Sequence, residues 1–193
     1  TLIKTMTTLE KYGTYITSSQ RAKEVDMCKK LRVILLGRKR GLAQAFAYLL
    51  GQGVAVPVVV VTDGSSVVGE IAQRHGTRVL SNDAELYRLI KENDPVIQNI
   101  DLVISYLFPK RIERQLIQLG RLGCVNFHPA PLPDYKGRAG YNTAILEQRK
   151  EYAVSTHFID SEKFDAGPII DVLRWTMDPE RETALTLEAT AQE

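Results

Sequence analysis

Apolar, β-branched runs alternate with amphipathic stretches along the chain from Leu31 onward. Short Val, Ile and Leu runs bounded by turn residues are typical of buried strands, and apolar residues at every third or fourth position are typical of helices. The pattern predicts strands over 31–36, 55–61, 77–80, 101–105, 124–127, 153–159 and 169–175, and helices over 42–50, 67–75, 83–93, 109–120, 141–147 and 180–193. We therefore expect an α/β domain with an open, mostly parallel, Rossmann-like sheet that helices cover on both faces.

The first thirty residues follow a different pattern. Residues 1–30 lack a sustained apolar period and begin with Thr, so they are expected to form an N-terminal extension, with Met27 as a candidate start. The chain contains 44% hydrophobic and 25% charged residues, which suits one compact core. Residues 31–193 are expected to form this domain, with its last helix cut short.

Charge and cysteine content narrow the class of protein. A net charge of +2 is too small to indicate a nucleic-acid-binding protein by itself. Cys28 and Cys124 lie far apart without metal-binding spacing, which favours a reducing compartment and disfavours a zinc site. The chain has no stretch of about twenty apolar residues. We therefore expect a cytoplasmic protein without a metal, in which Cys124 is a small core residue.

Polar side chains interrupt the apolar pattern at the end of the predicted strand 124–127. Asn126 and His128 occupy inward positions, and three prolines between residues 129 and 133 fix the following loop. Buried polar groups must find partners or take part in chemistry. Asp165 provides a carboxylate in a later Asp-Ala-Gly turn. Either motif alone is more often structural, but the carboxyl ends of strands are where ligands bind in such sheets.

The order and spacing of Asn126, His128, Leu132-Pro133 with Gly137, and Asp165-Ala166-Gly167 resemble those of folate-dependent formyltransferases. That family includes glycinamide ribonucleotide transformylase, methionyl-tRNA formyltransferase and the nucleotide-sugar N-formyltransferases. The likeness begins near residue 31 and is clearest over residues 101–170. It implies that residues 31–193 are a catalytic domain of the formyltransferase fold, with 10-formyltetrahydrofolate as formyl donor and a primary amine as acceptor.

The resemblance implies that Asn126, His128 and Asp165 are the catalytic residues. Formyl transfer to an amine proceeds through a tetrahedral intermediate with an oxyanion and requires removal of a proton. Asn126 can donate to the oxyanion, and His128 can act as base or, when protonated, as an oxyanion partner. Asp165 can orient His128 and raise its pKa, or move the proton through a water molecule. Our hypothesis is that His128 is the base and Asp165 supports it, and the sequence leaves open which of them takes the proton first.

The resemblance also implies a folate pocket between the turn that follows strand 101–105 and the loop 158–164. Without the resemblance, the sequence of the turn fits a corner of the hydrophobic core equally well. The sequence of the loop then fits an ordinary surface loop. The residues expected to contact the folate are Tyr106, Leu107, Phe108, Pro109, Ile112, Asp160 and Phe164.

The loop over residues 37–41 joins a predicted strand to a helix N-terminus, a place that suits anions. It has neither a G-x-G-x-x-G sequence nor a Walker lysine, so no dinucleotide or nucleoside triphosphate site is expected. Arg38 and Lys39 are candidates to bind a phosphate of the acceptor, and a solvated basic turn is the alternative. The loop also lacks the Gly/Ser/Asn-rich character of the transformylases of purine synthesis, which weighs against a ribonucleotide acceptor.

The sequence His-Pro-Ala-Pro-Leu-Pro at 128–133 differs from the His-Gly-Ser-Leu-Leu-Pro usual in methionyl-tRNA formyltransferases and looks closer to the nucleotide-sugar enzymes. We therefore expect a nucleotide-linked amino sugar as acceptor. The residues expected on the acceptor side of the pocket, besides Arg38 and Lys39, are Lys136, Arg138, Tyr141 and Asn142.

Several alternatives stay open. The same residues suit a methionyl-tRNA or glycinamide ribonucleotide formyltransferase, a formyltetrahydrofolate hydrolase that uses water as acceptor, or a non-catalytic folate-binding domain. Only the tRNA alternative involves a nucleic acid, and a homodimer is a further expectation. His75 precedes Gly76 at a predicted helix end and is expected to be structural, whereas His157 alternates with Ser155 along a strand and is expected to be a hydrogen-bonded core or rim residue.

Overall fold

The structure, a computed structural model, describes residues 31–138 and 140–192. The expected extension over residues 1–30, including Met27 and Cys28, lies outside the described residues. None of the described helices has the length and apolar character needed to cross a membrane.

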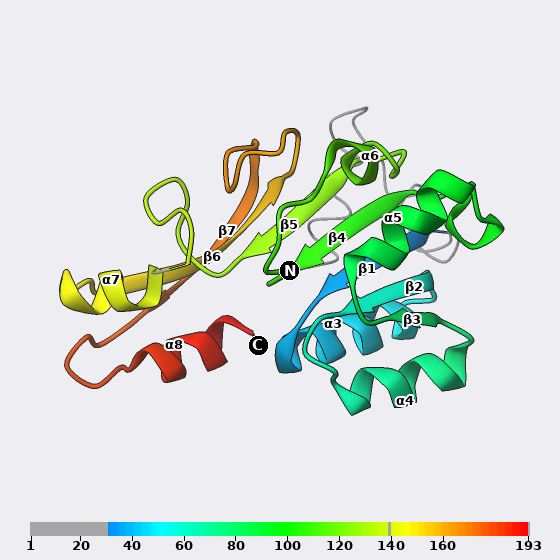
Figure 1. The fold of residues 1–193 in the computed structure, drawn as a ribbon. Helices are drawn as coiled ribbons and strands as arrows, with labels where there is room; N and C mark the ends of the chain where they lie inside the picture. The colour runs from blue at the N-terminus through cyan, green and yellow to red at the C-terminus, as the bar shows by residue number, and fades with distance from the viewer. Residues whose placement is uncertain (1–30, 139, 193) are drawn as a thin grey trace, which may run out of the picture.

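Seven strands form one sheet in the order β3-β2-β1-β4-β5-β6-β7 (Figure 1). The strands are β1 (Arg32–Gly37), β2 (Ala55–Val61), β3 (Arg78–Leu80), β4 (Leu102–Tyr106), β5 (Cys124–His128), β6 (Glu151–Phe158) and β7 (Ile169–Thr176). Strands β1 to β5 pair in parallel, whereas β6 is antiparallel to both of its neighbours. The predicted open, mostly parallel sheet is therefore confirmed. Strands β6 and β7, which are antiparallel to each other, extend it beyond β5.

Helices cover both faces of this sheet, as predicted. Figure 1 shows α3 and α4 below the sheet and α5 and α6 above it. The helices are α3 (Lys39–Gly51), α4 (Ser66–His75), α5 (Asp83–Glu92), α6 (Arg114–Ile117), α7 (Gly140–Leu146) and α8 (Ala184–Ala191), with a 3₁₀ turn η1 (Pro95–Ile97). Helices α7 and α8 share a third, smaller cluster of buried residues with β6. Helix α8, the last described helix, is shorter than the helix predicted over 180–193.

The strands are apolar on both faces because each face packs against helices. Leu35 lies in the cluster with α3 and α4, while its neighbour Leu36 lies in the cluster with α5 and α6, and both are fully buried. Such strands appear in the sequence as continuous apolar runs. Cys124 is fully buried in the second cluster, so its predicted role as a small core residue is confirmed, and burial raises the pKa of its thiol to about 12.

Two helices have recognisable end signals, and the end at His75 and Gly76 is as predicted. The side chain of Asn82 accepts a hydrogen bond of 3.1 Å from the Glu85 amide and caps α5. Helix α4 ends at His75, and Gly76 follows with a left-handed φ of 66°.

The predicted helix over 109–120 is wrong in most of its length, because only Arg114–Ile117 is α-helical. Leu107 has a φ of 55°, which turns the chain sharply after β4. The carbonyl of Pro109 accepts from Arg138, and the Glu113 amide donates to the Tyr87 hydroxyl. Since these backbone groups have partners elsewhere, the segment forms an irregular turn and leaves room for a cavity.

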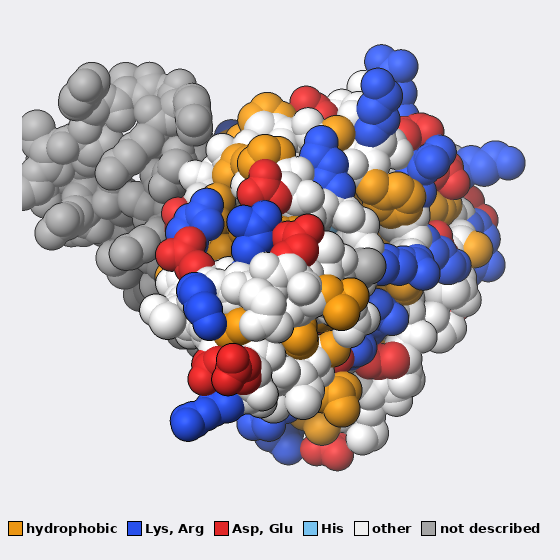
Figure 2. Space-filling view, turned by 90° about the vertical axis from the view of Figure 1, so that its left-hand side faces the viewer, with side chains coloured by type: hydrophobic (Ala, Val, Ile, Leu, Met, Phe, Trp, Pro, Cys, Tyr) orange, Lys and Arg blue, Asp and Glu red, His pale blue; other side chains and the backbone are white. Residues whose placement is uncertain are grey.

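Charged side chains of both signs are interspersed on the face shown in Figure 2, which lies on the α7 side of the molecule. Arg149 and Glu147, just after α7, form an ion pair of 3.0 Å, as do Arg174 and Glu151 on the last two strands. These two pairs of charges are therefore neutralised locally.

A close backbone approach at Gly37 provides a test of the packing of β1 against β4. A Cβ atom at Gly37 would lie 2.1 Å from the Tyr106 carbonyl oxygen. Gly37→Ala is expected to lower the free energy of unfolding by about 1–3 kcal/mol through overpacking, measured by urea denaturation followed by circular dichroism. Gly51→Ala is the control, since a Cβ there meets nothing within 4 Å. Equal midpoints for the two variants would contradict this description of the sheet.

Candidate active site

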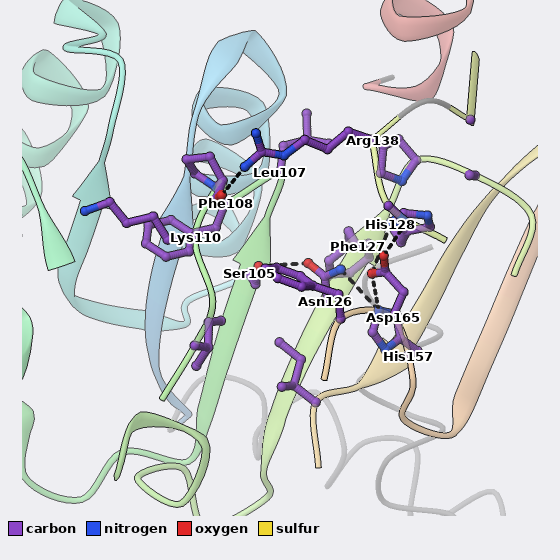
Figure 3. Close-up of a pocket in the computed structure, with 18 of the residues that line it drawn as sticks. Ser105, Leu107, Phe108, Lys110, Asn126, Phe127, His128, Arg138, His157 and Asp165 are labelled. Atoms are coloured by element: carbon purple, nitrogen blue, oxygen red, sulfur yellow. Dashed lines mark hydrogen bonds and ion pairs between the residues drawn. The ribbon is translucent and has the colours of Figure 1, made fainter. Parts of the chain in front are cut away.

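A cavity of about 300 Å³ opens at the carboxyl ends of β4 and β5 (Figure 3). Its walls come from the turn after β4, the end of β5, the loop before α7, the β6–β7 loop and the start of α8. This is the edge where open parallel sheets bind ligands. The irregular turn at 107–112 forms the apolar side of the cavity.

A row of polar side chains crosses three neighbouring strands beside the cavity. Ser105, Asn126 and His157 face one another in the registers of β4 with β5 and β5 with β6. Ser105 Oγ donates to Asn126 Oδ1 at 2.8 Å, and Asn126 Nδ2 lies 3.1 Å from His157 Nε2. Directly opposite residues in a sheet are close enough for such contacts. Strand pairing therefore builds this part of the site.

The hydrogen bonds of His157 define its tautomer. His157 Nδ1 lies 2.8 Å from the Phe158 carbonyl, which can only accept, so Nδ1 carries a proton. In the neutral ring Nε2 then accepts from Asn126. The expected hydrogen-bonded histidine is confirmed, but its partner is a site residue, which sequence reasoning missed because the pairing of β5 with β6 was unknown.

Asp165 lies between the two buried imidazoles. Its Oδ1 is 3.3 Å from His128 Nδ1 and 3.5 Å from His157 Nε2, and its Oδ2 accepts from the Gly137 amide at 2.9 Å. The Asp165 side chain is 8% exposed. The structure thus brings Asn126, His128 and Asp165 together, as the sequence predicted.

The turn that carries Asp165 depends on its glycine. A Cβ atom at Gly167 would lie 1.9 Å from the Phe158 carbonyl oxygen, so only glycine permits this close packing against the end of β6. The Asp-Ala-Gly motif therefore sets the position of the carboxylate.

His128 is held in one orientation by the loop that follows it. Its Nε2 lies 2.7 Å from the Tyr135 carbonyl and so carries a proton, which leaves Nδ1 as the titrating nitrogen facing Asp165. Buried Ser155 fixes the same loop, because it donates to the Ala130 carbonyl at 2.7 Å and accepts from the Leu132 amide at 2.9 Å.

Eight of the other predicted site residues line the cavity: Leu107, Phe108, Pro109, Ile112, Phe164, Arg38, Arg138 and Tyr141. Five do not: Tyr106, Asp160, Lys39, Lys136 and Asn142. The predicted roles of the eight residues that line the cavity stay predictions. The other five residues lie outside the lining of the cavity.

Tyr106 lies on the opposite face of the sheet from Ser105. Its ring packs against Phe127 with centroids 5.9 Å apart, and its hydroxyl donates to the Gln192 carbonyl at 3.3 Å. Lys39 forms an ion pair with Glu188. Asp160, Lys136 and Asn142 are exposed at the surface.

Comparison with known proteins places the chain in a family. A sequence model described as "Formyl transferase" matches residues 44–193. The chain belongs to the formyl transferase family. The fold of this formyl transferase domain agrees with the resemblance seen in its sequence.

Curated relatives of the domain are named methionyl-tRNA formyltransferase, and the chain covers only part of each. A methionyl-tRNA formyltransferase of Bacillus velezensis is 32% identical over 108 residues, covering 55% of this chain and 33% of the relative. The chain spans less than half of the length of such curated relatives, with about a third of the Bacillus velezensis protein and 48% of a methionyl-tRNA formyltransferase of Caldanaerobacter subterraneus.

Solved structures share the fold. A phosphoribosylglycinamide formyltransferase from Bacillus halodurans superposes with a TM-score of 0.66 at 25% identity, covering 83% of this chain and 87% of that chain. A formyltetrahydrofolate deformylase from Pseudomonas syringae has a TM-score of 0.68 at 19% identity, covering 84% and 56%, and this likeness shows the fold alone.

Burial and the nearby carboxylate act in opposite directions on His128. Burial, assisted by His157, lowers the pKa of His128, while Asp165 and the Tyr135 carbonyl oppose that shift without cancelling it. Burial alone would raise the pKa of Asp165, but its contacts with His157, His128 and the Gly137 amide hold that pKa below the usual carboxyl value. At neutral pH the domain therefore presents a neutral imidazole beside a carboxylate. Within 31–138 and 140–192, no three His, Cys, Asp or Glu side chains are grouped to hold a metal ion.

The lowered pKa of His128 predicts a pH dependence of stability. Because the unfolded chain binds a proton at His128 more readily than the folded domain, stability is full above the unfolded pKa of about 6.5 and falls as the pH is lowered below it. His128→Gln is expected to flatten the free energy of unfolding between pH 7 and 5, by at most about 1.4 kcal/mol per pH unit. Urea titrations at several pH values check this, and parallel curves for the two proteins would show that His128 titrates normally.

Proposed function

We propose that the domain transfers a formyl group from 10-formyltetrahydrofolate to a primary amine. The observation that supports this most is the Asn126 amide, which Ser105 orients at the cavity beside the His128 and Asp165 pair. An amide donor next to a titrating pair suits acyl transfer, in which an oxyanion forms and a proton leaves.

Asn126 supplies the oxyanion donor. Its amide nitrogen carries two hydrogens, of which one is directed at His157. The other is available to the oxygen of the formyl group as negative charge develops there. Because the Ser105 hydroxyl donates to Oδ1, the amide group does not turn away from this task. The donor is therefore preorganised, which is the condition for a large electrostatic contribution.

His128 and Asp165 receive the proton as a pair. The acceptor amine attacks the formyl carbon, its excess proton passes to the pair, and the bond from the formyl carbon to the folate nitrogen breaks as the pair gives that proton to the nitrogen. In the neutral state Nδ1 of His128 faces the carboxylate at 3.3 Å with no proton between them. A proton gained there forms an ion pair, so the carboxylate favours its uptake.

The apolar side of the cavity suits the folate. Leu107, Phe108 and Ile112 line it from the turn after β4, and Phe164 lines it from the β6–β7 loop, where the Arg111 guanidinium lies 5.7 Å from its ring centroid. Flat aromatic ligands bind between such walls. The turn lacks the helix predicted for it, so backbone groups along it that are not bonded within the protein can form hydrogen bonds to a heterocycle.

The identity of the acceptor amine is a more specific part of the proposal. The motif at 128–133 favours a nucleotide-linked amino sugar, whereas the names of the relatives favour methionyl-tRNA and phosphoribosylglycinamide. Methionyl-tRNA and glycinamide ribonucleotide therefore come first in a substrate panel, followed by dTDP- and UDP-linked amino sugars.

The first experiment incubates the protein with 10-formyltetrahydrofolate and each acceptor, and follows tetrahydrofolate and formylated product by mass spectrometry. We expect formylation of one acceptor, and Asn126→Ala is expected to lower kcat by about 10²–10³ while tetrahydrofolate still binds. Release of formate without an amine would indicate the hydrolase instead. Absence of folate binding would contradict the proposal as a whole.

The pH profile of Asp165→Asn tests the proton-accepting pair. Since the Asp165 charge raises the pKa of His128, its removal is expected to shift the acidic limb of kcat/KM to lower pH. The maximal rate is expected to fall by about 10² or more. Asp134→Asn, an exposed carboxylate in the neighbouring loop, is the control. An unshifted limb with a nearly normal rate would make Asp165 purely structural.

A further inference from the structure

A short segment after the proline-rich loop contacts both members of the His128 and Asp165 pair. The Tyr135 carbonyl accepts from His128 Nε2 at 2.7 Å, and the Gly137 amide donates to Asp165 Oδ2 at 2.9 Å. Between these contacts, His128 Nδ1 and Asp165 Oδ1 face each other at 3.3 Å (Figure 3). The contacts form a closed ring, so the position of residues 135–137 sets the separation of the imidazole from the carboxylate.

The Tyr135 side chain anchors this segment to the end of α7. Its hydroxyl donates to the Glu147 carboxylate and accepts from Arg149 Nε at 2.7 Å. The Arg149 guanidinium also lies 5.6 Å from the centroid of the Tyr135 ring. On β6, the Tyr152 ring packs against the same ring with centroids 6.4 Å apart. Because its hydroxyl both donates and accepts, the buried Tyr135 ring is held in one orientation.

The Glu147 and Arg149 pair is better suited to positioning than to stabilising the domain. Both side chains are about half exposed, and exposed ion pairs contribute little to stability. Gln148, between them, has a φ of 55°, so the chain turns sharply there, and both side chains reach one hydroxyl. The pair therefore acts on the Tyr135 side chain, whose backbone carbonyl contacts His128.

The Tyr135 carbonyl determines which nitrogen of neutral His128 carries the proton. A carboxylate is a stronger hydrogen-bond acceptor than a carbonyl. Asp165 faces Nδ1, so it would draw the proton to Nδ1 if Nε2 lost its partner. Nδ1 could then no longer accept a proton from an attacking amine. The carbonyl must stay in place to keep Nδ1 available.

We propose that Tyr135 is a positioning residue, and that the contacts of its hydroxyl with Glu147 and Arg149 keep Nδ1 of His128 free to accept a proton. The inference rests on the proposed function, because the tautomer affects the reaction only if His128 and Asp165 receive the proton of the amine. Tyr135, Glu147 and Arg149 do not line the cavity, so they act through His128 and not by contact with a substrate.

NMR of the imidazole nitrogens, in protein labelled at histidine, tests the tautomer without requiring turnover. The sequence has three histidines, and His157, which carries its proton on Nδ1, is an internal reference for the opposite tautomer. At about pH 8, above the ordinary histidine pKa of about 6.5, His128 is expected to carry its proton on Nε2. In Tyr135→Phe and Arg149→Gln, its nitrogen shifts are expected to move toward the form protonated at Nδ1, while those of His157 stay unchanged.

Arg174→Gln is the matched control. Arg174 and Glu151 form an ion pair of the same 3.0 Å length and similar exposure on β7 and β6, and its loss is expected to leave the His128 shifts unchanged. Unchanged His128 shifts in both test variants, or equal movement in the control, would overturn the inference. Since Arg149 is exposed, its replacement keeps the test decisive even if Tyr135→Phe does not fold.

Kinetics then distinguish positioning from binding. Tyr135→Phe is expected to lower kcat by about tenfold or more and to leave KM for the acceptor and for 10-formyltetrahydrofolate unchanged. Adding Glu147→Gln is expected to lower kcat little further, because both changes break the same contact. A raised KM at normal kcat would contradict a positioning role. Displaced His128 shifts without formyl transfer to any acceptor contradict the proposed function alone, whereas formyl transfer with undisturbed shifts contradicts the inference alone.

Discussion

The candidate site depends on a polar row inside an otherwise apolar sheet. Ser105, Asn126 and His157 come from three strands, and each satisfies the next only because the strands pair in one register. A shift of one residue in β5 would direct the Asn126 side chain to the opposite face and leave its neighbours without partners. Since an unpaired buried polar group is costly, the row both specifies the register and orients the amide.

The imidazoles of His128 and His157 both contact the Asp165 carboxylate, but they have different roles. His157 is tied to Asn126 and to the Phe158 carbonyl, so it supports the amide. His128 is tied to the Tyr135 carbonyl and directs its titrating nitrogen at Asp165. Burial keeps His128 neutral while the carboxylate is ready to favour its protonation. This opposition leaves His128 neutral and able to accept the proton of the attacking amine.

Local patterns predicted much of this arrangement, and nonlocal pairing decided the rest. The strand with Asn126 and His128, and the turn with Asp165, were recognisable because each depends on a few adjacent residues. His157 joins the site through antiparallel pairing with β5, which no local pattern shows. The helix expected over 109–120 failed because its backbone groups bond to Arg138 and Tyr87, residues distant in sequence. Tyr106 is a different case, since alternation along β4 already places its side chain on the face opposite Ser105.

The backbone at Asp165 has a φ of 48°, in the left-handed region that most side chains avoid. Aspartate and asparagine tolerate this conformation better than residues with longer side chains, because their short polar groups bond locally. A glutamate would bring the same charge but would suit this backbone less well and reach past both imidazoles. The conformation of the turn therefore favours aspartate over glutamate at this position independently of the reaction.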